Sequence, residues 1–152
     1  MTELVTNGHL IEVRQSWGDR APISIQDFGS RGRGVVAADD LKAGQLVERS
    51  PVLIIPSEQR GTVDATIIFT YVFMWEKDTI EEDLYQHEGR SAIALGYTSL
   101  LSHSYAPNCI FVRHIDERII EVFANRDIAS GEELTIDYQM TLWFKPEKIG
   151  YR

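Results

Sequence analysis

The sequence predicts a mainly β fold, because short apolar segments alternate with frequent turn residues along most of the chain. The 152 residues are 43% hydrophobic and 25% charged, which are ordinary values for a globular protein. Many short strands with regular turns are typical of a β-rich domain. No internal repeat or interdomain linker interrupts the pattern, so we expect residues 1–152 to form one domain.

In the first part of the chain, apolar segments separated by glycine-rich or acidic turns predict a series of strands. The segments expected to be strands are residues 10–14, 21–26, 35–37, 45–48 and 51–56. Residues 21–26 alternate apolar and polar side chains, as a half-buried strand does, and the glycine-rich residues 29–34 interrupt the alternation. Residues 39–44 read as a turn. Pro51 and Pro56 bracket the last segment, and we expect them to bound a short strand because proline lacks a backbone donor.

The middle of the chain is less regular. Residues 58–64 are polar and predict a loop, whereas the β-branched and aromatic content of residues 67–75 favours a strand for its later half. Residues 77–90 are charged, with one helical turn expected over residues 80–85. Two further strands are expected over residues 91–95 and 119–123, the second within a hairpin-like segment.

The charge balance bears on partners and location. A net charge of −8 argues against direct binding of nucleic acid, since phosphate binding depends on Lys and Arg. A basic peptide suits this charge better, although acidity also simply favours solubility. No apolar run is long enough to cross a bilayer, and the N-terminus lacks the pattern of a secretory signal. We therefore expect no membrane partner and a cytoplasmic protein, with a nuclear or exported location left open.

Cys109 is the only cysteine, which excludes an intramolecular disulfide and a cysteine-built zinc site. His103, Cys109 and His114 have no compact metal-ligand spacing, so we expect no metal. A lone thiol can be a nucleophile, but a small buried apolar side chain is the more common role, and we favour it for Cys109.

Four motifs stand out, in a fixed order along the chain. They are Gly-Arg-Gly-Val-Val-Ala at 32–37, Tyr-Val-Phe-Met-Trp at 71–75, Ser-His-Ser-x-x-Pro-Asn-Cys at 102–109 and Gly-Glu-Glu-Leu-Thr-Ile-Asp-Tyr at 131–138. In this order and spacing they resemble the motifs of the SET-domain protein-lysine methyltransferases. The first motif also nominally matches a dinucleotide fingerprint, but a turn follows it where a phosphate-binding helix should begin.

The resemblance implies a SET-domain fold of several small twisted sheets, with the C-terminal segment threaded through a loop as a pseudoknot. The motif-bearing core would span residues 22–138, and residues 139–152 would form a tail. Many family members close the cofactor site with a cysteine-rich tail, which this chain lacks. Trp143 or Phe144 would cover the adenine instead, or the tail would only pack on the surface.

The activity implied by the resemblance is transfer of a methyl group from S-adenosyl-L-methionine to a lysine amine of a protein substrate, for example a basic tail such as that of a histone. The enzyme would be a monomer or a homodimer. One departure motivates an alternative: the family's loop opens with Asn where this chain has Ser102, and a hydroxyl has fewer donors than an amide. The alternative is a non-catalytic SET-like module that binds a peptide or cofactor as a scaffold.

The resemblance also implies roles for single residues. Tyr138 would be the catalytic tyrosine and Tyr71 the tyrosine of the lysine channel, each with an ordinary core tyrosine as the alternative. Residues expected at the cofactor are Gly32, Arg33 and Gly34 beside its methionine portion, Ser102 and His103 through their backbone groups at its adenine, and Tyr138, Trp143 and Phe144. Lysine has a pKa of about 10.4, so an apolar, aromatic channel near a sulfonium cation would favour the neutral amine.

The expected channel residues are Tyr71, Tyr105, Phe111 and Ile136. Family members with tyrosine at the position of Ile136 tend to stop at one methyl group, so the smaller side chain implies di- or trimethylation.

Other polar residues near these motifs are expected to be structural. We expect Asn108 to bond backbone groups and hold the threaded loop. His103 is expected to fix its loop, with a general base as the alternative. Glu132 and Glu133 are expected to be solvated or bonded to the loop, with a pair of acid-base carboxylates as the alternative, and Asp137 is expected to be structural.

Overall fold

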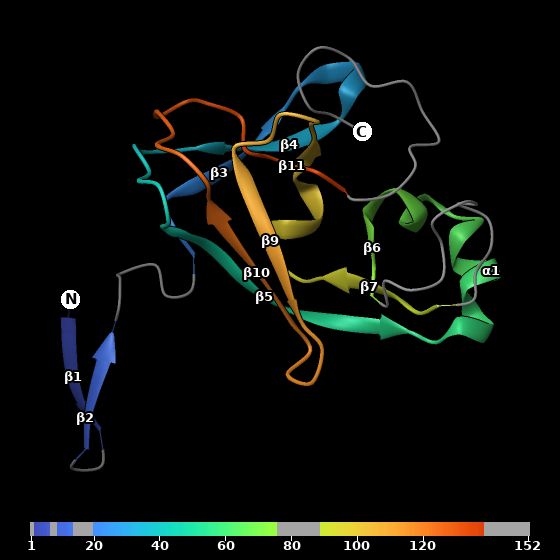
Figure 1. Ribbon diagram of the computed structural model, residues 1–152, viewed down its shortest axis with the longest axis horizontal. Coiled ribbons are helices and arrows are strands. Elements are labelled where there is room, and N and C mark those ends of the chain that lie inside the picture. The colour runs from blue at the N-terminus through green and yellow to red at the C-terminus, as the bar shows by residue number, and fades with distance from the viewer. Residues whose placement is uncertain (1, 7–8, 14–19, 76–88, 139–152) are drawn as a thin grey trace.

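The computed structural model describes residues 2–6, 9–13, 20–75 and 89–138, and it has the expected mainly β architecture (Figure 1). The largest sheet has five antiparallel strands in the order β6-β7-β5-β10-β9. These strands are β5 (Leu46–Ile55), β6 (Val72–Met74), β7 (Ser91–Ala94), β9 (Cys109–His114) and β10 (Ile119–Ala124). The strands expected over residues 91–95 and 119–123 are therefore confirmed.

Three smaller sheets have two strands each. They pair β1 (Thr2–Thr6) with β2 (His9–Val13), β3 (Ile23–Asp27) with β4 (Arg33–Ala37), and β8 (Ser102–His103) with β11 (Thr135–Ile136). The first two pairs are antiparallel, whereas β8 and β11 run parallel. The strands expected over residues 10–14, 21–26 and 35–37 are thus present, within a residue or two of the predicted bounds.

Strand β5 corrects one prediction. Residues 45–48 and 51–56 were expected to form two strands, but they form one strand of ten residues with Pro51 in its middle. The strand pairs with β10 as far as Pro51 and with β7 from Val52 onward. Proline is tolerated there because it stands where one neighbouring strand gives way to another, and its carbonyl still accepts from the backbone of Leu95 at 3.0 Å.

The short helices correct a second prediction. The segment expected to be a polar loop forms η2 (Ser57–Gln59) and α1 (Arg60–Asp64), which begin directly after the end of β5. The reason is a buried side chain: Arg60 is 1% exposed and donates from Nη1 to the backbone oxygen of Gly89 at 2.6 Å. Polar composition alone could not indicate this burial. A further 3-10 helix, η3 (Ile67–Tyr71), precedes β6, so only the later half of residues 67–75 is strand, as predicted.

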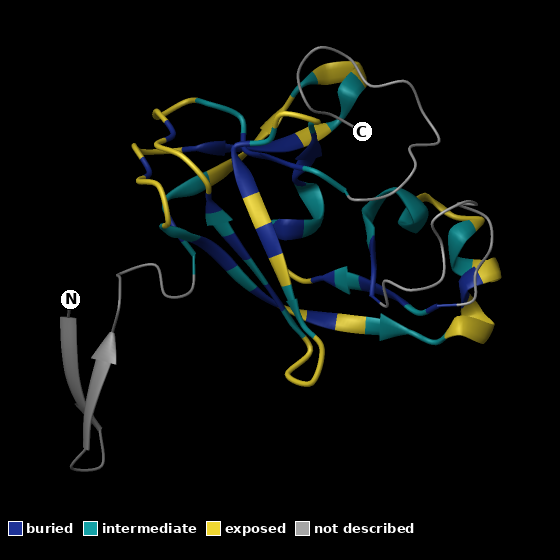
Figure 2. Ribbon diagram, in the orientation of Figure 1, coloured by how far each residue is buried: buried dark blue, intermediate teal, exposed yellow. Residues whose placement is uncertain are grey.

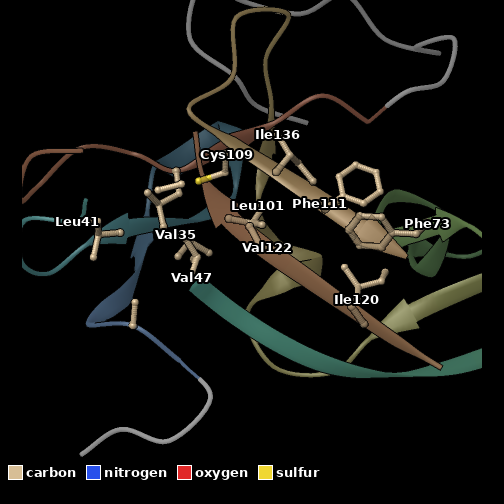
Figure 3. Packing of buried hydrophobic residues seen from close by; sticks show 14 of the residues in the cluster. Val35, Leu41, Val47, Phe73, Leu101, Cys109, Phe111, Ile120, Val122 and Ile136 are labelled. Atoms are coloured by element: carbon tan, nitrogen blue, oxygen red, sulfur yellow. The ribbon is translucent and has the colours of Figure 1, made fainter. Parts of the chain in front are cut away.

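The core lies between the large sheet and the segments carrying β4, β8 and β11. Its members come from strands distant in sequence, as Figure 3 shows for Val35, Val47, Cys109, Val122 and Ile136. Strand β10 follows a strict alternation, in which every second side chain is buried (Figure 2). Strand β3 departs from the half-buried pattern predicted for it, because four of its five residues are exposed, Ile25 among them. Its partner β4 supplies the buried layer instead.

The pairing of β8 with β11 brings the C-terminal segment back beside a loop that precedes the β9–β10 hairpin. This parallel pairing agrees with the expected pseudoknot. The helical turn predicted over residues 80–85 lies outside the described residues. Among the residues that the structure describes, no helix is long and apolar enough to cross a membrane.

Candidate functional site

The pairing of β8 with β11 brings Tyr138 beside residues 101–103, which we call the 101–103 loop. The Tyr138 hydroxyl donates to the backbone oxygen of Leu101 at 2.8 Å, and the Tyr138 backbone N–H donates to Nδ1 of His103 at 3.0 Å. The two rings lie 5.0 Å apart between centroids. The third and fourth sequence motifs, about thirty residues apart in the chain, therefore meet at one place.

Asn108 holds this pairing, as predicted. Its Nδ2 donates to the backbone oxygen of Glu133 at 2.9 Å, and its Oδ1 accepts from the backbone N–H of Thr135 at 2.8 Å. The Asn108 side chain thus bonds the backbone before and after the residue between Glu133 and Thr135, as a neighbouring strand would. Because the side chain is buried, losing it would leave two backbone groups without their partner.

His103 is fully buried, which favours its neutral form. Burial lowers its pKa, against the opposing effect of Asp137, whose Oδ1 lies 3.9 Å from Nδ1. Since Nδ1 accepts from the Tyr138 backbone, the proton belongs on Nε2, an assignment that follows from this hydrogen bond. Nε2 has no hydrogen-bond partner among the described residues. The loop-fixing role of the side chain is therefore confirmed, and a buried N–H donor remains available.

The glycine loop, residues 28–34, contains η1 (Gly29–Arg31) and leads into β4. Gly32 adopts φ +86°, a conformation that suits glycine, and its N–H donates to the Gly29 oxygen at 2.9 Å. Gly34 is needed for a different reason, because a Cβ there would lie 2.6 Å from Oε2 of Glu133. Arg33 is exposed. No helix follows in residues 38–45, which removes the dinucleotide-binding alternative.

The two neighbouring glutamates have separate partners. Glu133 accepts from Ser102 Oγ at 3.0 Å and from Arg31 Nη1 at 3.1 Å. Glu132 accepts from Arg126 at 2.8 Å and from the Ala129 backbone at 3.2 Å, and the Arg126 bond lowers the pKa of Glu132 despite partial burial. Each carboxylate is therefore bonded to its own partners, as expected, and they do not form an acid-base pair.

Arg31 is a residue that the sequence reasoning missed. Its only local signal was a positive charge within a glycine-rich segment, and its partner Glu133 lies 102 residues further along the chain. Charge complementarity at that separation cannot be read from one sequence.

The four predicted channel residues lie in different environments. Tyr71 is half-buried at the end of η3. Phe111 is buried with its ring edge-on to Phe73 at 5.2 Å, and Ile136 is fully buried (Figure 3). Tyr105 is 68% exposed, with its ring perpendicular to that of His103 at 4.5 Å. Trp143 and Phe144, expected near the adenine, lie outside the described residues.

Cys109 is fully buried on β9, and burial raises the pKa of its thiol to about 12. The thiolate needed for nucleophilic attack is therefore strongly disfavoured, and the packing role is confirmed. Within residues 20–75 and 89–138 and the two N-terminal strands, no group of three His, Cys, Asp or Glu side chains is placed to hold a metal ion.

This arrangement agrees with the comparison with known families, in which the SET domain matches residues 32–139. The chain belongs to the SET-domain family. Among its relatives is the histone H3 lysine-37 specific N-methyltransferase of Schizosaccharomyces pombe, which is 32% identical over 131 residues, with 84% of this chain and 80% of the relative covered. The histone H3 lysine-9 specific methyltransferase dim-5 of Neurospora crassa is 34% identical over 138 residues.

That second alignment covers 80% of this chain but 42% of dim-5, so the chain spans less than half the length of that relative. Solved structures agree on the fold. The Neurospora DIM-5 structure superposes with a TM-score of 0.58 at 27% identity, covering 86% of this chain and 57% of the other. A structure described as explaining the product specificity of histone lysine methyltransferases gives a TM-score of 0.60 at 30% identity, covering 80% and 52%.

Proposed function

We propose that this chain transfers methyl groups from S-adenosyl-L-methionine to lysine side chains of a protein substrate. Family membership and relatives named as lysine N-methyltransferases make it a protein-lysine methyltransferase. The observation that carries the assignment of the site is the junction where the Tyr138 hydroxyl meets the Leu101 carbonyl beside His103. The comparisons give no support to a non-catalytic scaffold.

The chemistry of the residues at this junction fits a polar, adenine-bearing cofactor. The Nε2–H of His103 is a buried donor with no acceptor among the described residues. In the proposal, Ser102 and His103 bind the adenine through backbone groups, while Gly32, Arg33 and Gly34 lie beside the methionine portion. Trp143 or Phe144 is proposed to cover the adenine. When bound, S-adenosyl-L-methionine supplies an electrophilic methyl group on a sulfonium centre.

Tyr138 acts at the site of transfer. Its hydroxyl hydrogen is directed at the Leu101 oxygen, which fixes the orientation of the phenol oxygen. An oriented oxygen dipole of this kind stabilises charge that develops on the methyl group and the amine, without reorganisation during transfer. The half-buried Tyr71 is the second catalytic candidate, because an aromatic wall disfavours the protonated lysine by desolvation.

The substrate channel in this proposal comprises Tyr71, Tyr105, Phe111 and Ile136. Ile136 is fully buried in β11, two residues before Tyr138. An aliphatic side chain there is smaller than the tyrosine of relatives that stop at one methyl group and leaves more room, which supports di- or trimethylation.

The proposed substrate is a basic protein tail such as that of a histone. The net charge of −8 favours a basic partner, and the relatives are named for lysines of histone H3. A histone substrate favours a nuclear location over the cytoplasmic one expected from composition. We retain a single SET domain over residues 1–152, with a core of 22–138 and a tail of 139–152, acting as a monomer or homodimer without direct nucleic-acid binding.

The test is the substitution Tyr138→Phe, assayed with histone H3 and labelled S-adenosyl-L-methionine. We expect the transfer rate to fall by about a hundredfold, because an oriented polar group at the reacting atoms is lost. The loss of one hydrogen bond should cost only about 1 kcal/mol of unfolding free energy. Tyr97→Phe is the matched control, since Tyr97 also packs against the core but its ring lies under the Arg20 guanidinium.

A wild-type protein that transfers no methyl group to histones or a lysine-rich protein panel, and whose melting temperature does not rise with the cofactor, would refute the proposed function. It would leave the scaffold alternative. Full activity of Tyr138→Phe would refute the catalytic role of Tyr138 alone.

A further inference from the structure

The carboxylate of Glu133 joins two parts of the site that lie far from it in the sequence. It accepts from Ser102 Oγ at 3.0 Å and from both terminal nitrogens of Arg31, at 3.1 and 3.4 Å. Arg31 ends η1 in the glycine loop, and Ser102 begins β8 in the 101–103 loop. We call Arg31, Ser102 and Glu133 the Glu133 cluster.

The Glu133 cluster is shielded from water and tightly fitted. The side chains of Arg31 and Glu133 are 18% and 8% exposed, and Ser102 is 3% exposed. The Arg31 guanidinium also lies over the Phe28 ring, 4.2 Å from its centroid. Charge-assisted hydrogen bonds at such a site are strong, because water neither competes for the donors nor screens the charges.

Gly34 makes the close approach possible. A Cβ at this position would lie 2.6 Å from Glu133 Oε2 and 2.9 Å from the Phe28 ring, so any side chain would push the carboxylate out of reach. Backbone contacts reinforce the arrangement, since the Leu134 N–H donates to the Val35 oxygen at 2.8 Å. Side-chain and backbone hydrogen bonds thus both hold the glycine loop and the start of β4 against residues 133–134.

We propose that the Glu133 cluster sets the affinity of the protein for its methyl donor by holding the glycine loop against the 101–103 loop. The inference rests on the proposed function, because those two loops carry the residues proposed to contact the methionine and adenine portions of the donor. Arg31 and Glu133 are positioning residues in this scheme. They act through the backbone of Gly32, Gly34 and Ser102, and the serine that replaces the family's asparagine takes part through its hydroxyl.

Glu132 shows that the neighbouring carboxylate cannot do the same. It pairs with Arg126 only six residues away, and both side chains are partly solvent-exposed, at 37% and 54%. Glu132 therefore links residues within one turn, whereas Glu133 links segments from opposite ends of the chain. This difference provides a matched control at the adjacent position.

The experiment compares Arg31→Lys, Ser102→Ala and Glu133→Gln with Glu132→Gln in the full chain. For each variant, we would measure the Kd of S-adenosyl-L-methionine by calorimetry, KM for donor and for histone H3, and the melting temperature without donor. Arg31→Lys retains the charge but loses the two-pronged contact, so it separates geometry from charge. It also guards against a variant that fails to fold.

We expect the Kd and KM for the donor to rise about tenfold in the three cluster variants, the size of losing one charge-assisted hydrogen bond. The KM for histone should change by less than about twofold, as expected when only donor binding is altered. Glu132→Gln should match the wild type in its Kd and KM for the donor and in its KM for histone. Unchanged donor Kd in Arg31→Lys and Ser102→Ala, with wild-type binding intact, would overturn this inference while leaving the proposed function standing. Absence of donor binding by the wild-type protein would refute both.

Discussion

Two buried glutamates, Glu48 and Glu133, occupy similar settings in different parts of the molecule. Glu48 accepts from Arg20 Nε at 2.6 Å, as Glu133 accepts from Arg31 at 3.1 Å. Each arginine also covers an aromatic ring, at 3.9 Å for Arg20 over Tyr97 and 4.2 Å for Arg31 over Phe28. Both carboxylates therefore have one cation that is itself fixed by stacking.

Each carboxylate also lies against a glycine that has no room for a side chain. A Cβ on Gly96 would lie 2.6 Å from Glu48 Oε1, the same distance as a Cβ on Gly34 from Glu133. The two glycines differ in one respect, because Gly96 also has φ +91° and no positive φ occurs at Gly34.

The difference lies in the remaining donors. Glu48 accepts from the backbone N–H of Tyr97 at 2.9 Å and from Thr98 Oγ1 at 2.7 Å, so it builds the turn that leads into η4 (Thr98–Leu100). Glu133 accepts from Ser102 and Arg31 side chains, so its carboxylate ties separate segments together. A carboxylate bonded to backbone contributes mainly to stability, whereas one bonded to side chains across a site contributes mainly to position.

Glu48→Ala should give the largest stability effect. It leaves the Tyr97 N–H and Thr98 hydroxyl without their acceptor, and we expect a loss of about 3 kcal/mol in unfolding free energy. The value lies at the low end for a broken buried pair because the Arg20 side chain is 36% exposed and can be hydrated. Urea denaturation followed by circular dichroism measures it. Glu132→Ala, at an exposed pair, is the control, and an equal loss in the two variants would contradict the comparison.

Alanine substitutions at the glycines should give intermediate effects. Gly96→Ala combines a left-handed conformation with crowding against Glu48, and we expect a loss of about 2 to 3 kcal/mol. Gly34→Ala introduces crowding alone, and we expect a loss of about 1 to 2 kcal/mol in unfolding free energy.

Gly44→Ala isolates the conformational part, since Gly44 has φ +83° and a Cβ added there would meet nothing within 4 Å; we expect about 1 kcal/mol. Denaturant midpoints of the three variants give the ranking. Gly34→Ala should also weaken donor binding, and Gly96→Ala should not. The reverse pattern would place the positioning role at Glu48.

Mild acid should give the smallest effect, and it probes the 101–103 loop that Glu133 contacts through Ser102. Because burial lowers the pKa of His103 below its ordinary value of 6.5, the unfolded chain binds more protons than the folded one just below that value. Stability should therefore be full above about pH 6.5 and decline as the pH falls below it. Urea denaturation at pH 7 and pH 5 measures the slope.

The control for this slope is His114→Gln. His114 lies on β9 and bonds Glu121 at 2.6 Å, away from the β8–β11 pairing. His114→Gln should leave the pH dependence of the unfolding free energy near pH 6 in place, and His103→Gln should remove it. A dependence that survives in His103→Gln would contradict the assignment to His103.

Much of the fold could be predicted because its signals are local. The alternation of residues 119–123 and the motif ending at Tyr138 each depend on neighbours in sequence, and the resemblance then placed Ser102 and His103 near Tyr138. The continuity of β5 through Pro51 could not be predicted, since it depends on which strand pairs on each side.

The sequence by itself determined most of the strand-forming segments, the order of the four motifs and, through them, the family. Only the tertiary structure decided that Glu133 pairs with Arg31, that Glu48 pairs with Arg20, and that Arg60 is buried beneath Gly89. The reason is physical: a strand or a turn follows from side chains a few residues apart, whereas a buried ion pair forms between any two charges that the packed backbone brings together, at separations of 28 or 102 residues here.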